Sequence, residues 1–452
     1  MCTFKITNDP NEIFIDKYLQ LGGPTLSNTI EIDGVYITHH LLSLTGELTP
    51  QPVERDGKYF LLVGEFYNYD VSLPSDIYFG IEKYLEYGDK FTEHLDGEFL
   101  FIVIDGDEIN FFSDPWGTKQ IYYHQDGDYF YFTTLPNDVN VVYTIRDDYL
   151  DRSDKIYRLP CNRKCTFNVN GTLHVIEDEL IKWNLDQNIN SLEDVDKTFE
   201  DAVLKRWYPN CTLFLSGGLD SSSVALCLAD NKKEFNVLTN MVNPQFEDQD
   251  VLDSVIKYCG KHIINYHRIE ESTDHSQEIP PKQALQAEIR RQTKERFNSK
   301  VVIMGNGADE IFDNYRTKEK TVVNGFGRSP ATIKSNFDVW PDDQSTIFPW
   351  EHFYGGQSRR LLDYHETYSL LYGLELRNVF YDKALAQAWL NVDVNIKNIE
   401  YKVFMKEYLR KRNIPITKFP QSGFGHQSWP IHPTWTTPKS GRRARPMWWT
   451  YK

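Results

Sequence analysis

A loop of small and polar residues at 216–222, SGGLDSS, follows the apolar run 213–215 and precedes the apolar-periodic segment 224–228. This order predicts a buried strand, a tight turn and the start of a helix. The adjacent glycines Gly217 and Gly218 let the backbone approach a ligand closely, and the N–H groups at a helix N-terminus favour an anion. The loop is therefore predicted to bind a phosphate or a pyrophosphate.

Asp220 lies inside this loop, where its carboxylate would repel a phosphate unless a metal ion, usually Mg²⁺, lay between them. The loop lacks the GK[ST] ending of a Walker motif. It resembles the pyrophosphate loop of the N-type ATP pyrophosphatases, which adenylate a substrate and release pyrophosphate. That resemblance assigns contacts with ATP or pyrophosphate to Leu215, Ser216, Gly217, Gly218, Asp220, Ser221, Ser222 and Asn240.

A second glycine loop with carboxylates, GNGADE, follows the apolar run 301–304. It resembles the SGEGSDE loop of asparagine synthetases. The resemblance implies that Asp309 joins Asp220 as a metal ligand for Mg²⁺–pyrophosphate, with Gly305 and Gly307 giving close backbone approach. The alternative is that Asp309 belongs to an ordinary acidic pair at a helix N-terminus.

Cys2 follows the initiator methionine, and removal of Met1 would leave its thiol beside a free α-amine. Such an amine, with a pKa of about 7.7 to 8, can act as a base for the nucleophile of the same residue. The alternative is a cysteine that stands second by chance.

Three stretches of the first half give Cys2 a context: GEFYNYD at 64–70, LDGEFLFIVID at 95–105 and SDPWGTKQIYYH at 113–124. In this order they resemble landmarks of the glutamine amidotransferase domain of asparagine synthetases. The resemblance makes Cys2 the glutaminase nucleophile and places Asp76 and Glu65 at the glutamine site, with Asp76 receiving the substrate amine.

Two positions depart from the family pattern. Leu41 stands where the family has the Arg that clamps the glutamine carboxylate, and Val63 stands where it has an Asn of the oxyanion hole. Loss of one oxyanion donor costs about 3 kcal/mol in the transition state. We therefore expect glutamine hydrolysis to be weak or absent, or the acyl substrate to differ.

The segment 365–382, HETYSLLYGLELRNVFYD, resembles the synthetase stretch GLEARVPFLD, which implies an acceptor site containing Glu375 and Arg377. Asn306 joins this site, at a position where the synthetases carry a Glu. Lys402 and Lys418 match basic family positions that face the phosphates or the substrate, so both are candidate catalytic residues. Structural roles for Glu375 and Arg377, and solvated surface positions for the lysines, are the alternatives.

Apolar alternation between Asp-Gly and Asn-Gly turns predicts an α+β domain at 1–180, with stacked antiparallel sheets of the N-terminal nucleophile type. Strand and helix then alternate, which predicts an α/β domain at 190–425 with a parallel sheet of the ATP pyrophosphatase type. The tail 426–452 is basic and rich in Trp and Pro. It is expected to fold back on the acidic body, although aromatic and basic residues interleaved also suit nucleic acid.

The 452 residues suit two or three domains, and 40% hydrophobic with 25% charged residues is typical of a globular protein. A net charge of −16 argues against nucleic acid and anionic membranes as partners. No apolar run approaches the roughly 20 residues of a membrane span, so we expect a cytoplasmic protein. Cys161 and Cys165 are a weak metal signal and are interpreted as ordinary thiols. The oligomeric state is left open, with a homodimer as one arrangement.

The order of motifs implies an ATP- and Mg²⁺-dependent ligase of the asparagine synthetase type. It would adenylate aspartate or an analogue, transfer ammonia from glutamine, and release AMP and pyrophosphate. Two alternatives stay open. One is an intramolecular amide-forming cyclase resembling β-lactam synthetases or lasso-peptide cyclases, with a vestigial glutaminase half. The other is a catalytically silent binding protein.

Overall fold

The computed structural model describes residues 2–12, 17–135, 156–240, 249–269, 281–315 and 337–416. The chain forms two compact units. Unit 1 comprises Met1–Trp183 and Tyr354–Leu376, and unit 2 comprises Asn184–Phe353 and Arg377–Lys452. The chain therefore returns to unit 1 late in the sequence.

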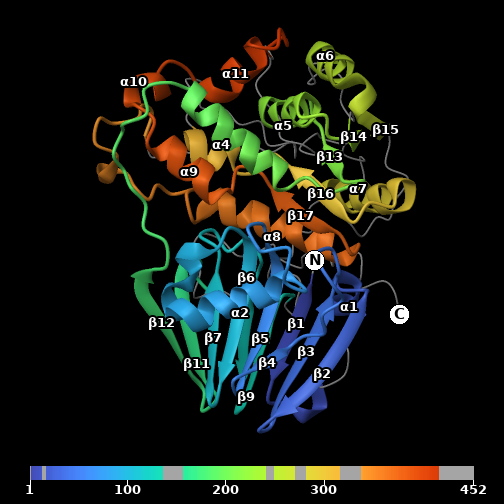
Figure 1. Ribbon diagram of the computed structural model, residues 1–452, viewed down its shortest axis with the longest axis vertical. Coiled ribbons are helices and arrows are strands. Elements are labelled where there is room, and N and C mark those ends of the chain that lie inside the picture. Colours follow the sequence, from blue (N-terminus) through green and yellow to red (C-terminus); the bar gives the residue numbers. More distant parts are fainter. Residues whose placement is uncertain are drawn as a thin grey trace, which may run out of the picture. The chain divides into compact units, whose positions relative to one another are not determined.

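Two six-stranded sheets, with antiparallel pairing, form most of unit 1 (Figure 1). The first has the order β10-β8-β9-β1-β3-β2 and the second has the order β12-β11-β7-β6-β5-β4. The strands of the first sheet are β1 (Thr3–Thr7), β2 (Leu26–Ile32), β3 (Val35–Leu41), β8 (Tyr122–Asp126), β9 (Tyr129–Thr133) and β10 (Ile156–Arg158). Those of the second are β4 (Val53–Arg55), β5 (Lys58–Phe66), β6 (Gly97–Asp105), β7 (Glu108–Ser113), β11 (Arg163–Asn168) and β12 (Thr172–Glu179).

The helices of unit 1 are short and come from distant parts of the chain. They are η1 (Pro10–Glu12), α1 (Lys17–Gly22), α2 (Asp76–Tyr87), η2 (Gly88–His94) and α8 (Gly356–Leu371). Helix α2 packs against β5, and α8 packs against α1. The late segment that carries α8 is thus integrated into the fold of unit 1.

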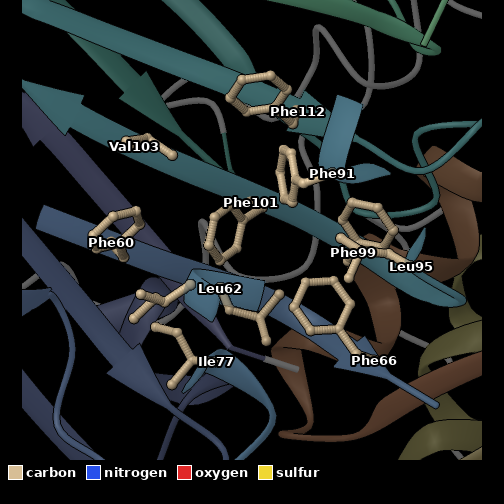
Figure 2. Close-up of a cluster of buried hydrophobic side chains, with 11 residues drawn as sticks. Phe60, Leu62, Phe66, Ile77, Phe91, Leu95, Phe99, Phe101, Val103 and Phe112 are labelled. Carbon is tan, nitrogen blue, oxygen red and sulfur yellow. The ribbon is translucent and has the colours of Figure 1, made fainter. Parts of the chain in front are cut away.

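Continuous apolar runs in its central strands β5, β6 and β7 give the second sheet two buried faces. One face packs on the first sheet, where the Phe111 and Phe132 rings lie 4.6 Å apart. The other carries Phe60, Phe66 and Phe101 and lies beneath α2 and η2 (Figure 2). The core of unit 1 is therefore filled mainly by aromatic side chains on both sides of this sheet.

Unit 2 is built on a five-stranded sheet with the order β15-β14-β13-β16-β17. The four strands β15, β14, β13 and β16 pair in parallel. The strands are β13 (Thr212–Phe214), β14 (Phe235–Asn240), β15 (Ile263–Ile269), β16 (Val301–Met304) and β17 (Glu375–Asn378). The division between the two units falls inside β17.

Helices follow the strands of unit 2 along the chain, as a parallel sheet requires. They are α4 (Glu193–Leu204), α5 (Leu219–Asp230), α6 (Gln249–Cys259), η4 (Gly260–His262), α7 (Pro281–Phe297), η5 (Ala308–Asp313), η6 (Gln344–Thr346), α9 (Lys383–Leu390), α10 (Val394–Lys397) and α11 (Val403–Arg410). The element η5, which follows β16 and carries Asp309, is a π-helix, a type found mostly at functional positions.

The predicted fold class is confirmed, since antiparallel sheets form the first part and a parallel sheet the second. Strands β1 and β2 and helix α7 were not anticipated. Among the described residues, no helix has both the length and the apolar character needed to cross a membrane. All six cysteines are free.

Replacing Phe101 with Ala is expected to destabilise unit 1 by about 3–5 kcal/mol, because the residue is fully buried and its ring lies 5.3 Å from that of Phe91. Denaturant unfolding measures the change. Leu85→Ala on α2, where Leu85 is 43% exposed, is the control and should cost less than about 0.5 kcal/mol. Equal losses in both variants would contradict this account of the core.

Candidate functional site

The loop after β13 is held in shape by its own serines. The Ser216 N–H donates to Ser221 Oγ at 3.1 Å, and the Gly218 N–H donates to Ser216 Oγ at 3.1 Å. Leu215 is buried, and its N–H donates to the Leu238 carbonyl at 3.0 Å. The loop is thereby fixed at the end of β13, directly before the N-terminus of α5.

The loop after β16 approaches the first one closely. A Cβ on Gly305 would lie 3.0 Å from Asp220 Cβ and 3.1 Å from the Ser221 nitrogen, so a larger residue there would require the facing loop to shift by a few tenths of an ångström. β13 and β16 are neighbouring parallel strands, and their loops leave the same edge of the sheet. The structure thus brings together the two motifs that the sequence holds about 90 residues apart.

Lys402 joins these loops into one ionic cluster. Its Nζ lies 2.7 Å from both carboxylate oxygens of Asp220 and 2.8 Å from Asp309 Oδ1. The lysine side chain is fully buried, whereas those of Asp220 and Asp309 are 22% and 28% exposed. A ligand can therefore reach the two carboxylates while the ammonium supports them from beneath.

Hydrogen bonds also fix the backbone of Lys402 and the side chain of the residue before it. The Lys402 backbone N–H donates to Asp313 Oδ2 at 2.7 Å, and its φ of 53° places it in the left-handed region, uncommon for a lysine. The neighbouring Tyr401 hydroxyl hydrogen-bonds with Asp309. The sequence analysis did not identify Tyr401 or Asp313, although both belong to the segments that carry Lys402 and Asp309.

In this cluster, burial and ionic contacts shift the pKa of each charged group in opposite directions. Burial by itself would lower the pKa of Lys402, but Asp220 and Asp309 offset it and raise the pKa above its ordinary value. Burial also raises the pKa of Asp220 to about 6, with Asp309 adding to the shift and Lys402 opposing it. Near neutral pH the cluster therefore contains a charged lysine and an ionised Asp220.

The donor set of this cluster suits Mg²⁺, which in phosphate-transfer sites is commonly held by one or two carboxylates together with substrate phosphates. Asp220 and Asp309 supply two carboxylates on adjoining loops. In the described part of the chain no group of three potential metal-binding side chains occurs. Mg²⁺ held by one or two carboxylates commonly completes its coordination with water and substrate phosphates. Ser222 is fully buried, and its hydroxyl has no partner among the described residues.

The residues expected at the acceptor site take up three different positions. Asn306 donates from Nδ2 to Asn378 Oδ1 at 3.1 Å, beside the phosphate loops. The Arg377 guanidinium donates to the Arg206 carbonyl at 2.8 Å and lies over the Tyr208 ring. Glu375 instead lines a cavity in unit 1.

This cavity contains Cys2, Glu65 and Asp76 together with Glu375. Cys2 is 5% exposed, and its thiol points to the Leu42 carbonyl at 3.9 Å. Asp76 lies in the first turn of α2 and accepts from the Phe66 N–H at 3.2 Å. The three predicted glutaminase residues are thus brought to one place from the position before β1, from β5 and from α2.

Burial and the acidic side chains of the cavity disfavour ionisation of the Cys2 thiol. Burial raises the pKa of Cys2 to about 12, and Glu375 and Asp76 contribute to the shift. Burial and the nearby Glu65 raise the pKa of Asp76 to about 7. Leu41 lines the cavity, whereas Val63 is buried in β5 and is not among the lining residues.

Lys119, which the sequence analysis did not identify, forms a buried ionic group behind Glu375. Its Nζ lies 2.6 Å from Glu375 Oε1 and 2.9 Å from Glu366 Oε1. Burial opposes its charge, but the two carboxylates raise the pKa of Lys119 above its ordinary value. Lys119 lies in the stretch SDPWGTKQIYYH at 113–124, and its place there could have identified it from the sequence.

Three predictions lie outside the described residues: Lys418, the side chain of Asn240 and the tail 426–452. Cys161 is partly buried and Cys165 is buried. The roles of all predicted site residues stay predictions.

The family model described as asparagine synthase matches residues 194–416. Asparagine synthetase (glutamine-hydrolyzing) 2 of Oryza sativa subsp. japonica is 22% identical over 347 residues, covering 67% of this chain and 56% of the rice protein. The match therefore spans little more than half of the rice protein's length. A probable asparagine synthetase (glutamine-hydrolyzing) of Schizosaccharomyces pombe is 23% identical over 451 residues, covering 85% of this chain and 73% of that protein.

Among solved structures, glutamine phosphoribosylpyrophosphate amidotransferase from B. subtilis has a TM-score of 0.31 at 11% identity, covering 68% of this chain and 91% of that chain. A TM-score this low carries no argument about fold or function. The assignment depends on the family model and on the two synthetases. Residues 194–416 thus match the asparagine synthase family model, and the weak similarity to two asparagine synthetases supports the same family.

Proposed function

We propose that this protein is an ATP-dependent amide-forming ligase that adenylates a carboxylate, aspartate or an analogue of it. The observation that carries the proposal is the ionic cluster of Lys402, Asp220 and Asp309 between two phosphate-type loops. The match of residues 194–416 to the asparagine synthase family model supports it. A cytoplasmic location and a homodimer are consistent with this proposal.

In the first step a carboxylate oxygen of the acceptor attacks the α-phosphorus of ATP, and the bond to the pyrophosphate leaving group breaks. The loops after β13 and β16 bind the pyrophosphate part through backbone N–H groups and serine hydroxyls. Asp220 and Asp309 would hold Mg²⁺, which would neutralise phosphate charge. Lys402 stabilises the negative charge that develops on the leaving group.

In the second step a neutral amine attacks the acyl carbonyl, AMP leaves with the bonding electron pair, and the nitrogen loses a proton. The family resemblance makes glutamine the nitrogen donor, through Cys2, and the meeting of Cys2, Glu65 and Asp76 in one cavity supports this. Leu41, Val63 and the buried thiol favour a donor other than glutamine.

An intramolecular cyclase is the second candidate. The specific observation in its favour concerns Asn306, which stands where the family resemblance expects a Glu carboxylate. The Asn306 carboxamide is hydrogen-bonded to that of Asn378. A carboxamide cannot take a proton from an attacking amine as that Glu could. The acceptor would then carry both the carboxylate and the amine.

ATP–pyrophosphate exchange with a panel of carboxylic acids tests the proposed activity. We expect exchange that requires one acid, and a loss of roughly 10²–10³-fold in Lys402→Met, because the cation beside the leaving group is removed. Lys406→Met on the same helix should retain exchange, since Lys406 pairs with Glu400 away from the loops. Absence of exchange with every acid, or full exchange in Lys402→Met, would contradict the proposal.

The exchange rate should also depend on pH through Asp220. Its carboxyl is ionised above its pKa of about 6 and becomes protonated below it, which removes a metal ligand. We expect exchange at subsaturating Mg²⁺ to fall as pH decreases through about 6, while circular dichroism shows an intact fold. A profile that stays flat from pH of about 8 down to about 5 would argue against this role.

A glutaminase assay on the purified protein tests the donor. We expect turnover reduced by roughly 10²–10³-fold or more relative to a glutaminase with an intact oxyanion hole, because Val63 supplies no amide donor. Any residual activity should vanish in Cys2→Ala. Normal turnover abolished by this substitution would show that glutamine is the donor.

A further inference from the structure

Two donors meet at one oxygen of the Asp309 carboxylate. The Tyr401 hydroxyl donates to Asp309 Oδ1, and Lys402 Nζ lies 2.8 Å from the same atom. A carboxylate oxygen offers about two lone-pair positions, so these contacts use the full accepting capacity of Oδ1. Among the described residues, none donates a hydrogen bond to Asp309 Oδ2. Asp309 therefore has one occupied oxygen and one that is available to a ligand.

Asp309 is also the accessible acid of its loop. Its side chain is 28% exposed, whereas the adjacent Glu310 is 2% exposed and accepts from the Tyr315 hydroxyl. The Tyr315 N–H donates to the Asp309 carbonyl at 3.1 Å and fixes the backbone of η5 at this residue. A cation that approaches η5 from solvent therefore meets the carboxylate of Asp309 and not that of Glu310.

Lys402 restricts the second carboxylate, that of Asp220, in a different way. Lys402 Nζ lies 2.7 Å from both oxygens of Asp220, so it is equidistant from them. A metal ion bound by both oxygens of one carboxylate must be nearly equidistant from them as well. The ammonium thus lies near the position that such an ion would take. Asp220 can therefore offer a metal ion only one oxygen at a time.

The two restrictions favour one kind of divalent cation. Binding through both oxygens of Asp309 needs a free lone pair on each, and Oδ1 has none while Tyr401 and Lys402 contact it. Ca²⁺ accepts both oxygens of a carboxylate into a large and flexible coordination shell. Mg²⁺ has a small octahedral shell and is commonly held by one or two carboxylates with water and substrate phosphates. Carboxylates that offer one oxygen each therefore suit Mg²⁺ better than Ca²⁺.

Tyr401 supplies its part of this restriction without a charge. A tyrosine hydroxyl is a neutral hydrogen-bond donor near neutral pH. Lys402 Nζ lies 5.7 Å from the centroid of the Tyr401 ring, so a phenylalanine would keep an aromatic ring beside the lysine. The phenylalanine would remove only the donor and would free one lone pair of Asp309 Oδ1. Both oxygens of Asp309 could then bind the same metal ion.

We propose that Tyr401 is a positioning residue that makes the site of unit 2 selective for Mg²⁺ over Ca²⁺, because it leaves Asp309 with one free oxygen. The inference rests on the proposed function in regarding Asp309 as a ligand of a metal ion that binds together with a nucleotide. It adds which ion the site selects and which side chain sets that choice from outside the coordination shell.

Isothermal titration calorimetry of ATP into the full chain, in saturating MgCl₂ and separately in saturating CaCl₂, tests the proposal. The measured quantity is the dissociation constant with Ca²⁺ divided by that with Mg²⁺. We expect a ratio well above one in the parent chain and a fall of roughly tenfold in Tyr401→Phe, the usual effect of removing an outer partner of a metal ligand. A general loss of packing would weaken binding with both ions and leave the ratio unchanged. A parent ratio near one, or the parent ratio in Tyr401→Phe, would overturn the proposal.

Two further comparisons show where Tyr401 acts. Tyr258→Phe removes another hydroxyl of unit 2, which donates to Asp230 Oδ1 at 2.7 Å, and should keep the parent ratio. Asp309→Asn has one carboxyl oxygen fewer, so adding Tyr401→Phe to it should change the ratio no further. A full tenfold fall on adding Tyr401→Phe to Asp309→Asn would show that Tyr401 does not act through Asp309 and would refute the inference.

ATP–pyrophosphate exchange by the parent chain separates this inference from the proposed ligase. Exchange together with an unchanged ratio in Tyr401→Phe would refute the role of Tyr401 and leave the ligase standing. A ratio that falls in Tyr401→Phe, without exchange for any acid of the panel, would refute the ligase and leave a Mg²⁺-selective nucleotide site. Absence of ATP binding with both ions would overturn the inference about Tyr401.

Discussion

The site of unit 2 depends on one buried cation. Lys402 neutralises two carboxylates that belong to loops after different strands, and without it Asp220 and Asp309 would repel each other at close range. The lysine can occupy this place because Asp313 and Tyr401 fix the turn before α11, at the cost of a left-handed backbone. Gly305 then permits the two loops to meet. The close approach of the two loops and the placement of their carboxylates both depend on this charge balance.

Buried acidic side chains also lie beside Cys2 in unit 1. Lys119 compensates Glu366 and Glu375, so that part of the unit is ionically paired. The lining around Glu65 and Asp76 has no basic side chain, since the clamp position holds Leu41. Burial therefore raises the pKa of both Asp76 and Cys2 instead of stabilising their charged forms. Unit 2 thus pairs its carboxylates with a buried lysine, whereas burial in unit 1 favours the neutral forms of Asp76 and Cys2.

Much of the fold could be predicted, because hydrophobic periodicity is a local property. The β5 and β6 segments are nearly continuous apolar runs, and the glycine turn before α5 marks its N-terminus. Other elements carry weaker local signals. β2 has mostly partly exposed residues, and α7 has little apolar periodicity, so neither was anticipated. The placement of 354–376 in unit 1 depends on packing of α8 against α1, which involves residues more than 300 positions apart in sequence.

The sequence by itself determined the fold classes and located the two glycine loops and the candidate nucleophile Cys2, because each depends on residues that are close along the chain. Only the tertiary structure decided which charges meet. It paired Lys402 with both loops, assigned Glu375 to the cavity of Cys2, engaged Arg377 with backbone carbonyls, and revealed Lys119, Tyr401 and Asp313. The reason is physical: the energy of a charge depends on distance and burial, and neither can be obtained from spacing along the chain.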